Sequence, residues 1–142
     1  MTDPAQVSRL RTAAASAMAA EVAALEWHRA RLRVNSVGGL SEAAAELHRR
    51  DGGAEAVAAP TEAVSRMLDL RELMAADGHG AWLSATLTLT RTPTGPLDFT
   101  FDFDYDSRPS WQIEPDDRAY VEDLARHPRP PEEVPGWYPS IA

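Results

Sequence analysis

The stretch that decides the fold is Leu97–Trp111, LDFTFDFDYDSRPSW. In it, aromatic residues alternate with polar ones: Phe99, Phe101, Phe103 and Tyr105 against Thr100, Asp102, Asp104 and Asp106. Successive side chains of a β-strand point to opposite faces of a sheet, so the alternation predicts a strand with one aromatic and one acidic face. We expect the aromatic face to be buried core. The carboxylates, spaced about 6.6 Å apart along the strand, need water, a metal ion, an arginine or a partner surface.

Further strands are expected on both sides of this one in the sequence. Trp82–Thr90 also alternates, and the Pro/Gly loop Arg91–Pro96 joins it to the acidic strand, which predicts an antiparallel hairpin. Trp27–Val34 alternates as well and is followed by a turn at 36–39. Glycines on both sides of Leu40–Arg50 favour a strand there over the helix that its alanines and glutamates permit. Residues 54–59 fit a short strand or a loop.

Three segments are expected to be helical. Thr2–Ala24 has Thr2 or Asp3 as its N-cap, a second helix begins at 60–61 and ends near Gly78, and a third begins at 115–117 and ends before Pro128. The order α-β-β-α-β-β-α predicts an α+β fold, with an antiparallel sheet of about four strands and helices packed on one face. We expect one domain over 1–142, whose proline-rich tail (128–142) is anchored by Trp137 and Tyr138.

Charge is concentrated in the last third of the chain. The formal net charge is −8, and the span 98–133 holds eleven acids against four arginines, a local net charge of −7. Such a field repels nucleic acid and anionic lipid and attracts basic partners. We therefore expect neither nucleic-acid nor membrane binding. The chain has no cysteine and no apolar run of signal-peptide or membrane-span type, so a cytoplasmic location is expected.

The acidic run has several possible roles. Its D-x-D-x-D spacing is similar to a calcium loop, but that loop needs glycine at position six and glutamate at position twelve, where this chain has Ser107 and Ile113. A solvated sheet face and a partner-binding face both remain open. A third possibility is internal pairing with an arginine face on the earlier strand, each ion pair contributing about 0.2–1 kcal/mol; that face consists of Arg29, Arg31 and Arg33.

Catalytic motifs are not found in the sequence. The four histidines are scattered without a second ligand at helical or hairpin spacing, and no Gly-x-Ser-x-Gly or phosphate-binding loop occurs. We expect no enzymatic activity, no metal and no cofactor. A small metal-dependent enzyme that uses the acidic run is the weakest alternative.

Several short motifs in the second half follow one another in a familiar order: Gly80-Ala81-Trp82-Leu83, Phe103–Trp111, Asp117…Tyr120…Asp123-Leu124, Pro128-Arg129 and Val134–Tyr138. Over roughly 70–138 the chain resembles the actinobacterial YezG-like immunity proteins, which are encoded beside polymorphic or contact-dependent toxins. The resemblance implies a cytoplasmic antitoxin that binds a cognate toxin domain and blocks its active site, with no enzymatic activity and no cofactor. It leaves the toxin class open between nuclease and NAD-glycohydrolase.

Charge and resemblance together give a hypothesis for the binding surface. Toxins of these classes present basic residues to phosphates, so an acidic inhibitor gains steered association. Tyr105 and Trp111 are the expected anchors. The expected partner-binding residues are Asp102, Asp104, Asp106, Arg108, Trp111, Glu114, Asp116 and Asp117. The alternative function is a non-inhibitory protein-interaction or scaffold domain of a secretion-associated system.

Overall fold

The computed structural model describes residues 2–93, 95 and 97–139. Its elements, in chain order, are α1 (Pro4–Val22), β1 (Arg29–Val37), β2 (Leu40–His48), β3 (Ala54–Val57), α2 (Thr61–Ala75), β4 (Ser84–Thr90), β5 (Asp98–Asp104), α3 (Asp117–Arg126) and a 3₁₀ turn, Pro131–Glu133. The expected α+β class and element order are confirmed. The sheet has five strands rather than about four, because the undecided segment at 54–59 forms β3.

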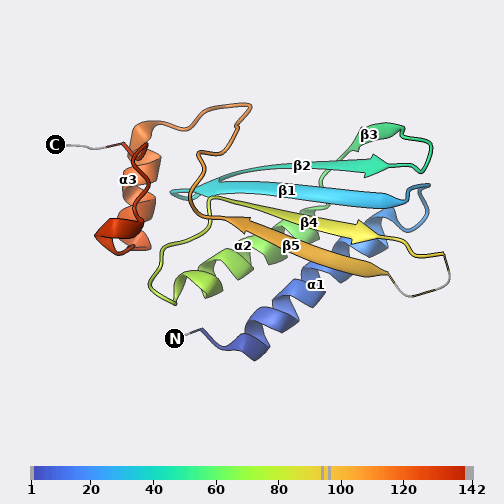
Figure 1. Ribbon diagram of the computed structural model, residues 1–142, viewed down its shortest axis with the longest axis horizontal. Coiled ribbons are helices and arrows are strands. Elements are labelled where there is room, and N and C mark those ends of the chain that lie inside the picture. The colour runs from blue at the N-terminus through green and yellow to red at the C-terminus, as the bar shows by residue number, and fades with distance from the viewer. Residues whose placement is uncertain (1, 94, 96, 140–142) are drawn as a thin grey trace.

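The strands lie in the order β3-β2-β1-β4-β5, and every neighbouring pair is antiparallel. Figure 1 shows α1 and α2 on one side of this sheet and α3 at one end of it. The expectation of helices on one face therefore holds for α1 and α2, whereas α3 closes the end. The other broad face has no helix over it in the described part of the chain.

The strand over Leu40–His48 is confirmed, although its composition also permits a helix. Ala45 and Leu47 of this strand are buried in the core. The preceding strand is longer than expected, because the turn takes only Gly38 and Gly39. Both have positive φ, 56° and 83°, which a two-residue type I′ hairpin requires and which glycine adopts without strain.

The main core lies between the sheet and the two long helices. Leu32, Leu87 and Leu89 of the sheet are fully buried against Met18 of α1 and Met67 of α2. Fully burying side chains of this size stabilises the fold by about 1.5–3 kcal/mol each.

The aromatic face of β5 is only half-buried, which corrects the expectation that it is core. Phe101 and Phe103 pack against the main core but stay partly accessible, and Phe99 is 37% exposed. The reason is topological: β5 is the last strand of the sheet and has a neighbour on one side only. The guanidinium of Arg11 in α1 lies over the Phe101 ring, 5.2 Å from its centroid.

A second, smaller cluster joins α3 to the end of the sheet. Its buried members are Val37, Leu83, Ala119 and Tyr120. The sequence alternation of β4 would place Leu83 on the same face as Ala85, Leu87 and Leu89. Leu83 instead belongs to this second cluster, and Trp82 belongs to the main core. The reason is that the strand, and with it the regular alternation, begins only at Ser84. The tail is anchored as expected, since the rings of Trp137 and Tyr138 lie 5.4 and 5.9 Å from that of Tyr120.

The turn between β1 and β2 gives a test of the docking of α3. A Cβ on Gly38 would overlap the backbone oxygen of Ala119, whereas a Cβ on Gly39 meets nothing within 4 Å. Gly39→Ala should therefore lower the free energy of unfolding only by the penalty for placing alanine at positive φ, about 1–2 kcal/mol. Gly38→Ala should cost clearly more, because it also displaces α3. Urea unfolding of both variants measures the difference, and equal losses would contradict this packing.

Candidate functional site

The acidic face of β5 is the starting point for the site. Asp98 and Asp102 are exposed on the sheet face that no helix covers, with Thr100 between them. Among the described residues neither carboxylate has a salt-bridge partner. These two groups are therefore available to a partner.

Asp104 has a different role. Its Oδ1 accepts the backbone N–H groups of Asp106 and Ser107, at 3.0 and 2.9 Å, and so shapes the turn that ends β5. Partial burial raises the pKa of the Asp104 carboxyl, but these N–H groups and the charge of Arg33 outweigh burial and hold the pKa below its usual value. Asp104 is thus ionised and engaged within the chain.

Asp106 lies beyond the end of the strand, and its side chain is 83% exposed. Its backbone oxygen accepts the indole N–H of Trp137 at 2.6 Å, which fixes the loop to the tail. Its Oδ1 is 3.7 Å from Nη1 of Arg129, a side chain that is only 2% exposed. Asp106 therefore stands at the surface beside a buried cation.

The other expected partner-binding residues gather around the start of α3 and bind one another. Arg108 donates to Oε1 of Glu114 at 2.8 Å and lies 3.8 Å from Oδ1 of Asp117. Its guanidinium also lies 5.1 Å from the centroid of the Tyr120 ring. The hydrogen bond with Glu114, together with its charge, raises the pKa of Arg108 above its ordinary value. This ion pair lies at the surface, where such pairs contribute about 0–1 kcal/mol.

Trp111 and Asp116 act within the fold. The indole N–H of Trp111 donates to the Tyr120 hydroxyl at 3.0 Å, so one edge of this expected anchor is engaged. Asp116 is the N-cap of α3, and its side chain accepts the backbone N–H of Arg118. The structure therefore separates the eight expected residues into a strand group and a group around α3, with Asp106 between them.

The open question of pairing between the arginine row and the aspartates is answered by the strand order. β4 lies between β1 and β5, and one row across the sheet runs Arg33, Thr86, Asp102. Two strand spacings place the ends of that row about 10 Å apart. Among the described residues no salt bridge joins the rows, and Arg31 instead lies 3.8 Å from Glu46 of β2.

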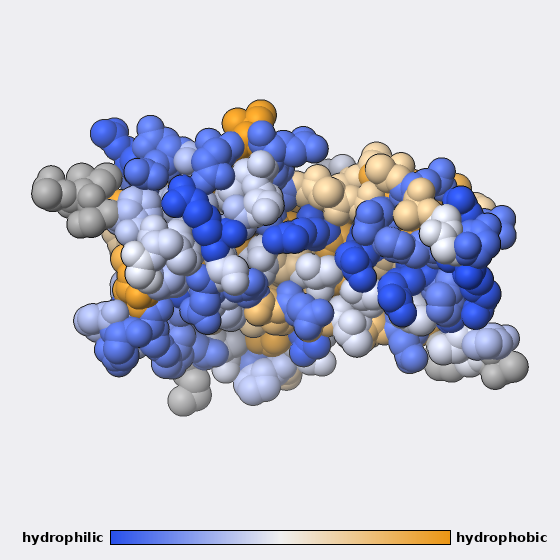
Figure 2. Space-filling view, turned by 45° about the horizontal axis from the view of Figure 1, so that its top comes forward, coloured by the Kyte–Doolittle hydropathy of each residue, from blue (hydrophilic) through white to orange (hydrophobic). Residues whose placement is uncertain are grey.

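The uncovered face is closed at one end by the loop after β5. The side chain of Asn35 donates to the Ser110 oxygen at 2.8 Å, and the Glu42 carboxylate accepts the backbone N–H groups of Gln112 and Ile113. Figure 2 shows a surface dominated by hydrophilic and neutral side chains, with a weakly hydrophobic patch toward β2 and β3, where Ala44 and Ala56 are exposed. The acidic groups of β5 thus border a broad polar surface.

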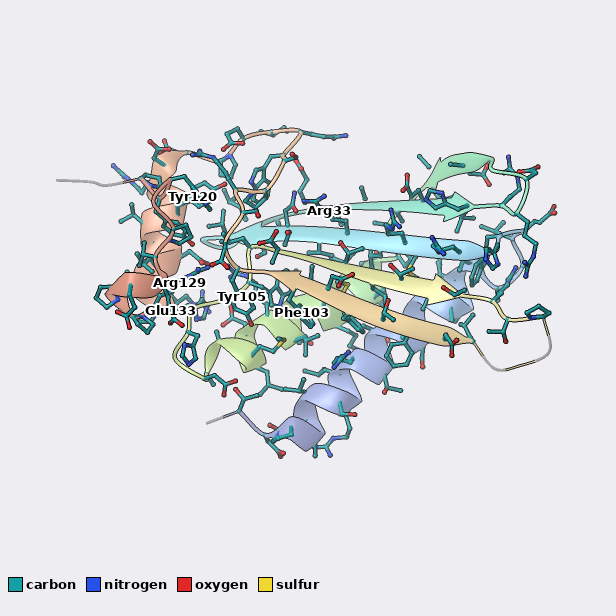
Figure 3. All side chains as sticks on the ribbon, in the orientation of Figure 1. Arg33, Phe103, Tyr105, Tyr120, Arg129 and Glu133 are labelled. Carbon is teal, nitrogen blue, oxygen red and sulfur yellow. The ribbon has the colours of Figure 1, made fainter. Side chains whose placement is uncertain are left out.

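A cavity of about 560 Å³ lies between the tail, the end of β5 and the loop after α2. Figure 3 shows Tyr105, Arg129 and Glu133 close together at this end of the sheet. His79 Nδ1 lies 2.9 Å from Oε2 of Glu133 and bridges the two sides of the cavity. The hydrogen bond to Glu133 raises the pKa of His79 above its ordinary value of 6.5.

A buried ion pair that no sequence pattern indicated holds α3 in place. Nη2 of Arg71 in α2 lies 2.8 Å from Oδ1 of Asp123 in α3, and both side chains are 4% exposed. Arg71 Nε also donates to the Trp82 oxygen at 2.7 Å, and Asp123 Oδ1 accepts the N–H of Gly38 at 3.0 Å. In α3, Tyr120 and Asp123 are buried, whereas the apolar side chains of Val121 and Leu124 are only partly buried.

Neither a family model nor a curated protein matches the chain. Within residues 2–93, 95 and 97–139, no three histidine, aspartate or glutamate side chains are placed to hold a metal ion. In the same residues, no helix has the length and apolar content needed to cross a membrane.

The buried pair predicts a large and specific loss of stability. Asp123→Asn leaves the buried Arg71 guanidinium without its counter-charge, and we expect the free energy of unfolding to fall by about 3–5 kcal/mol. Glu62→Gln is the matched control, because its partner Arg66 is exposed and the pair is worth about 0.5 kcal/mol or less. Urea unfolding measures both, and similar losses would contradict the structural role of Asp123.

The contact between His79 and Glu133 predicts a pH dependence. A raised folded pKa means that the contact is at full strength below pH 6.5 and is lost as the pH rises through the higher folded value. NMR titration of the His79 ring should give a midpoint above 6.5, and Glu133→Gln should return it toward 6.5. An unchanged midpoint in the variant would show that Glu133 does not hold the imidazolium.

Proposed function

We propose that this chain is an immunity protein that binds and neutralises a basic toxin domain of the nuclease or NAD-glycohydrolase class, with carboxylates at the β5 end of the molecule. The observation that supports it best is the pair of exposed carboxylates, Asp98 and Asp102, that lack ion-pair partners on an uncovered sheet face. Unpaired carboxylates in a row do not stabilise the fold, so we infer that they serve the binding of a basic partner.

The chemistry of such toxins fits this surface. Active sites that handle phosphates use arginine and lysine, which a carboxylate row can engage by charge-assisted hydrogen bonds. A local net charge of −7 over 98–133 also speeds encounter with a basic partner. The YezG-like motifs of the second half agree with this function.

Contacts within the chain distinguish the expected binding residues from one another. Asp104 forms a turn, and Arg108 pairs with Glu114 and Asp117, so these groups position the surface rather than lie free on it. Asp98 and Asp102 are exposed and have no ion-pair partner among the described residues, and Asp106 is exposed although it lies 3.7 Å from Arg129. Tyr105, an expected anchor, lines the cavity beside Asp106, and its ring is half-buried.

Co-expression with the candidate toxin domain encoded beside this gene tests the function. An immunity protein restores growth of cells that produce the toxin, whereas a non-inhibitory scaffold domain binds without restoring growth. Loss of viability despite full expression of the folded chain would contradict the proposal.

Charge reversal tests the surface itself. Asp98→Lys with Asp102→Lys should weaken toxin binding by at least tenfold, since both side chains are exposed and their replacement leaves the fold intact. The matched control is Glu21→Lys with Glu55→Lys, which makes the same change of net charge at exposed positions of α1 and β3. Titration calorimetry at low salt measures both, and equal affinities for the two double variants would contradict a site on β5.

A further inference from the structure

β5 is one of the two terminal strands of the sheet, and it is seven residues long. A terminal strand carries a row of backbone N–H and C=O groups with no neighbour, which another extended chain can pair. The opposite terminal strand, β3, has only four residues. β5 therefore offers the longer free edge.

The edge of β5 is protected by negative charge alone. Natural terminal strands are guarded by proline, by charged side chains or by brevity, and Asp98–Asp104, DFTFDFD, has neither proline nor lysine but three aspartates, which repel an acidic strand and attract a basic one. Figure 1 shows β5 at the border of the sheet, with α1 and α2 behind the sheet.

A second copy of this chain does not fit the edge. A two-fold antiparallel pairing of β5 with itself, centred on Phe101, sets Asp98 opposite Asp104 at both ends. Moving the centre to Thr100 sets Asp98 opposite Asp102. Like charges directly opposite each other destabilise a strand pair, so the carboxylates act against self-association.

We propose that the free edge of β5 receives an extended strand of the toxin domain, in which lysine or arginine alternates with apolar residues. This inference rests on the proposed function and adds the mode of binding and the chemistry of the bound segment. The backbone of the incoming strand pairs with β5 and extends the sheet to six strands.

The two faces of β5 differ in a way that favours an incoming strand in which basic and apolar residues alternate. On the uncovered face, Asp98 and Asp102 lie where cross-strand neighbours of opposite charge add about 0.2–1 kcal/mol each. On the helix face, Phe99 is 37% exposed and Phe101 is half-buried, so apolar side chains of the added strand cover rings that the fold leaves accessible. One partner segment thus satisfies the carboxylates, the aromatic row and the backbone at once.

The test uses a capped seven-residue peptide that alternates arginine with valine. The control is the same peptide N-methylated at its five inner residues, which keeps charge and side chains but removes backbone donors. NMR hydrogen exchange should show slower exchange of β5 amides with the first peptide and unchanged β3 amides. The N-methylated peptide should bind at least tenfold more weakly. Equal affinity of the two peptides, or protection away from β5, would overturn strand addition.

Two variants of the chain complete the test. Asp98→Asn with Asp102→Asn should weaken the unmodified peptide at least fivefold, while Glu21→Gln with Glu55→Gln should leave its affinity unchanged. Failure of strand addition and failure of the proposed function are distinguishable. If the chain restores growth of toxin-producing cells but the peptide does not slow hydrogen exchange of the β5 amides, strand addition alone is refuted. If the peptide slows that exchange but the chain does not restore growth, the immunity function alone is refuted.

Discussion

The ion pair between Arg71 and Asp123 is the interaction on which the acidic end of the molecule depends. It joins α2 to α3 in the interior, at 2.8 Å, and each partner makes a further hydrogen bond to the backbone. Two charges removed from water are costly unless every group finds a partner. Here the Trp82 oxygen and the Gly38 N–H supply those partners, so the pair fixes α3 at a single position on the end of the sheet.

The placement of α3 determines the path of the loop that precedes it. The loop leaves β5 at the turn made by Asp104, crosses the end of the sheet where Glu42 and Asn35 bind it, and enters α3 at Asp116. Most of the acids in this path therefore serve the fold. Asp98 and Asp102 of β5, which precede the loop, have no ion-pair partner among the described residues.

The sheet and the three helices were predictable because alternation and capping are local signals. The alternation of the acidic strand and the hairpin with β4 depend on neighbouring residues only, as does the glycine turn at 38–39. The burial of Phe99 was not predictable in this way, because it depends on which strand lies at the border of the sheet. Residues 54–57 were undecided for a related reason: so short a strand forms through pairing with β2 rather than through its own pattern.

The candidate site was predictable as a region and not as a set of contacts. The distribution of charge along the sequence indicates the acidic third of the chain. It does not indicate that Arg108 forms an ion pair with Glu114, or that β4 lies between the arginine row and Asp102. Arg71 and Asp123 gave no signal, since each lies 52 residues from its partner and looks like an ordinary helix residue.

The salt dependence of association with the proposed toxin domain tests the central proposal, that Asp98 and Asp102 of β5 attract a basic partner. The association rate constant should fall by at least tenfold as salt rises from low to physiological levels, because exposed charges are screened over about 8 Å at physiological ionic strength. Neutralising Asp98 and Asp102 should flatten that dependence. An association rate that stays constant over this range, with the same value for the neutralised variant, would contradict the account.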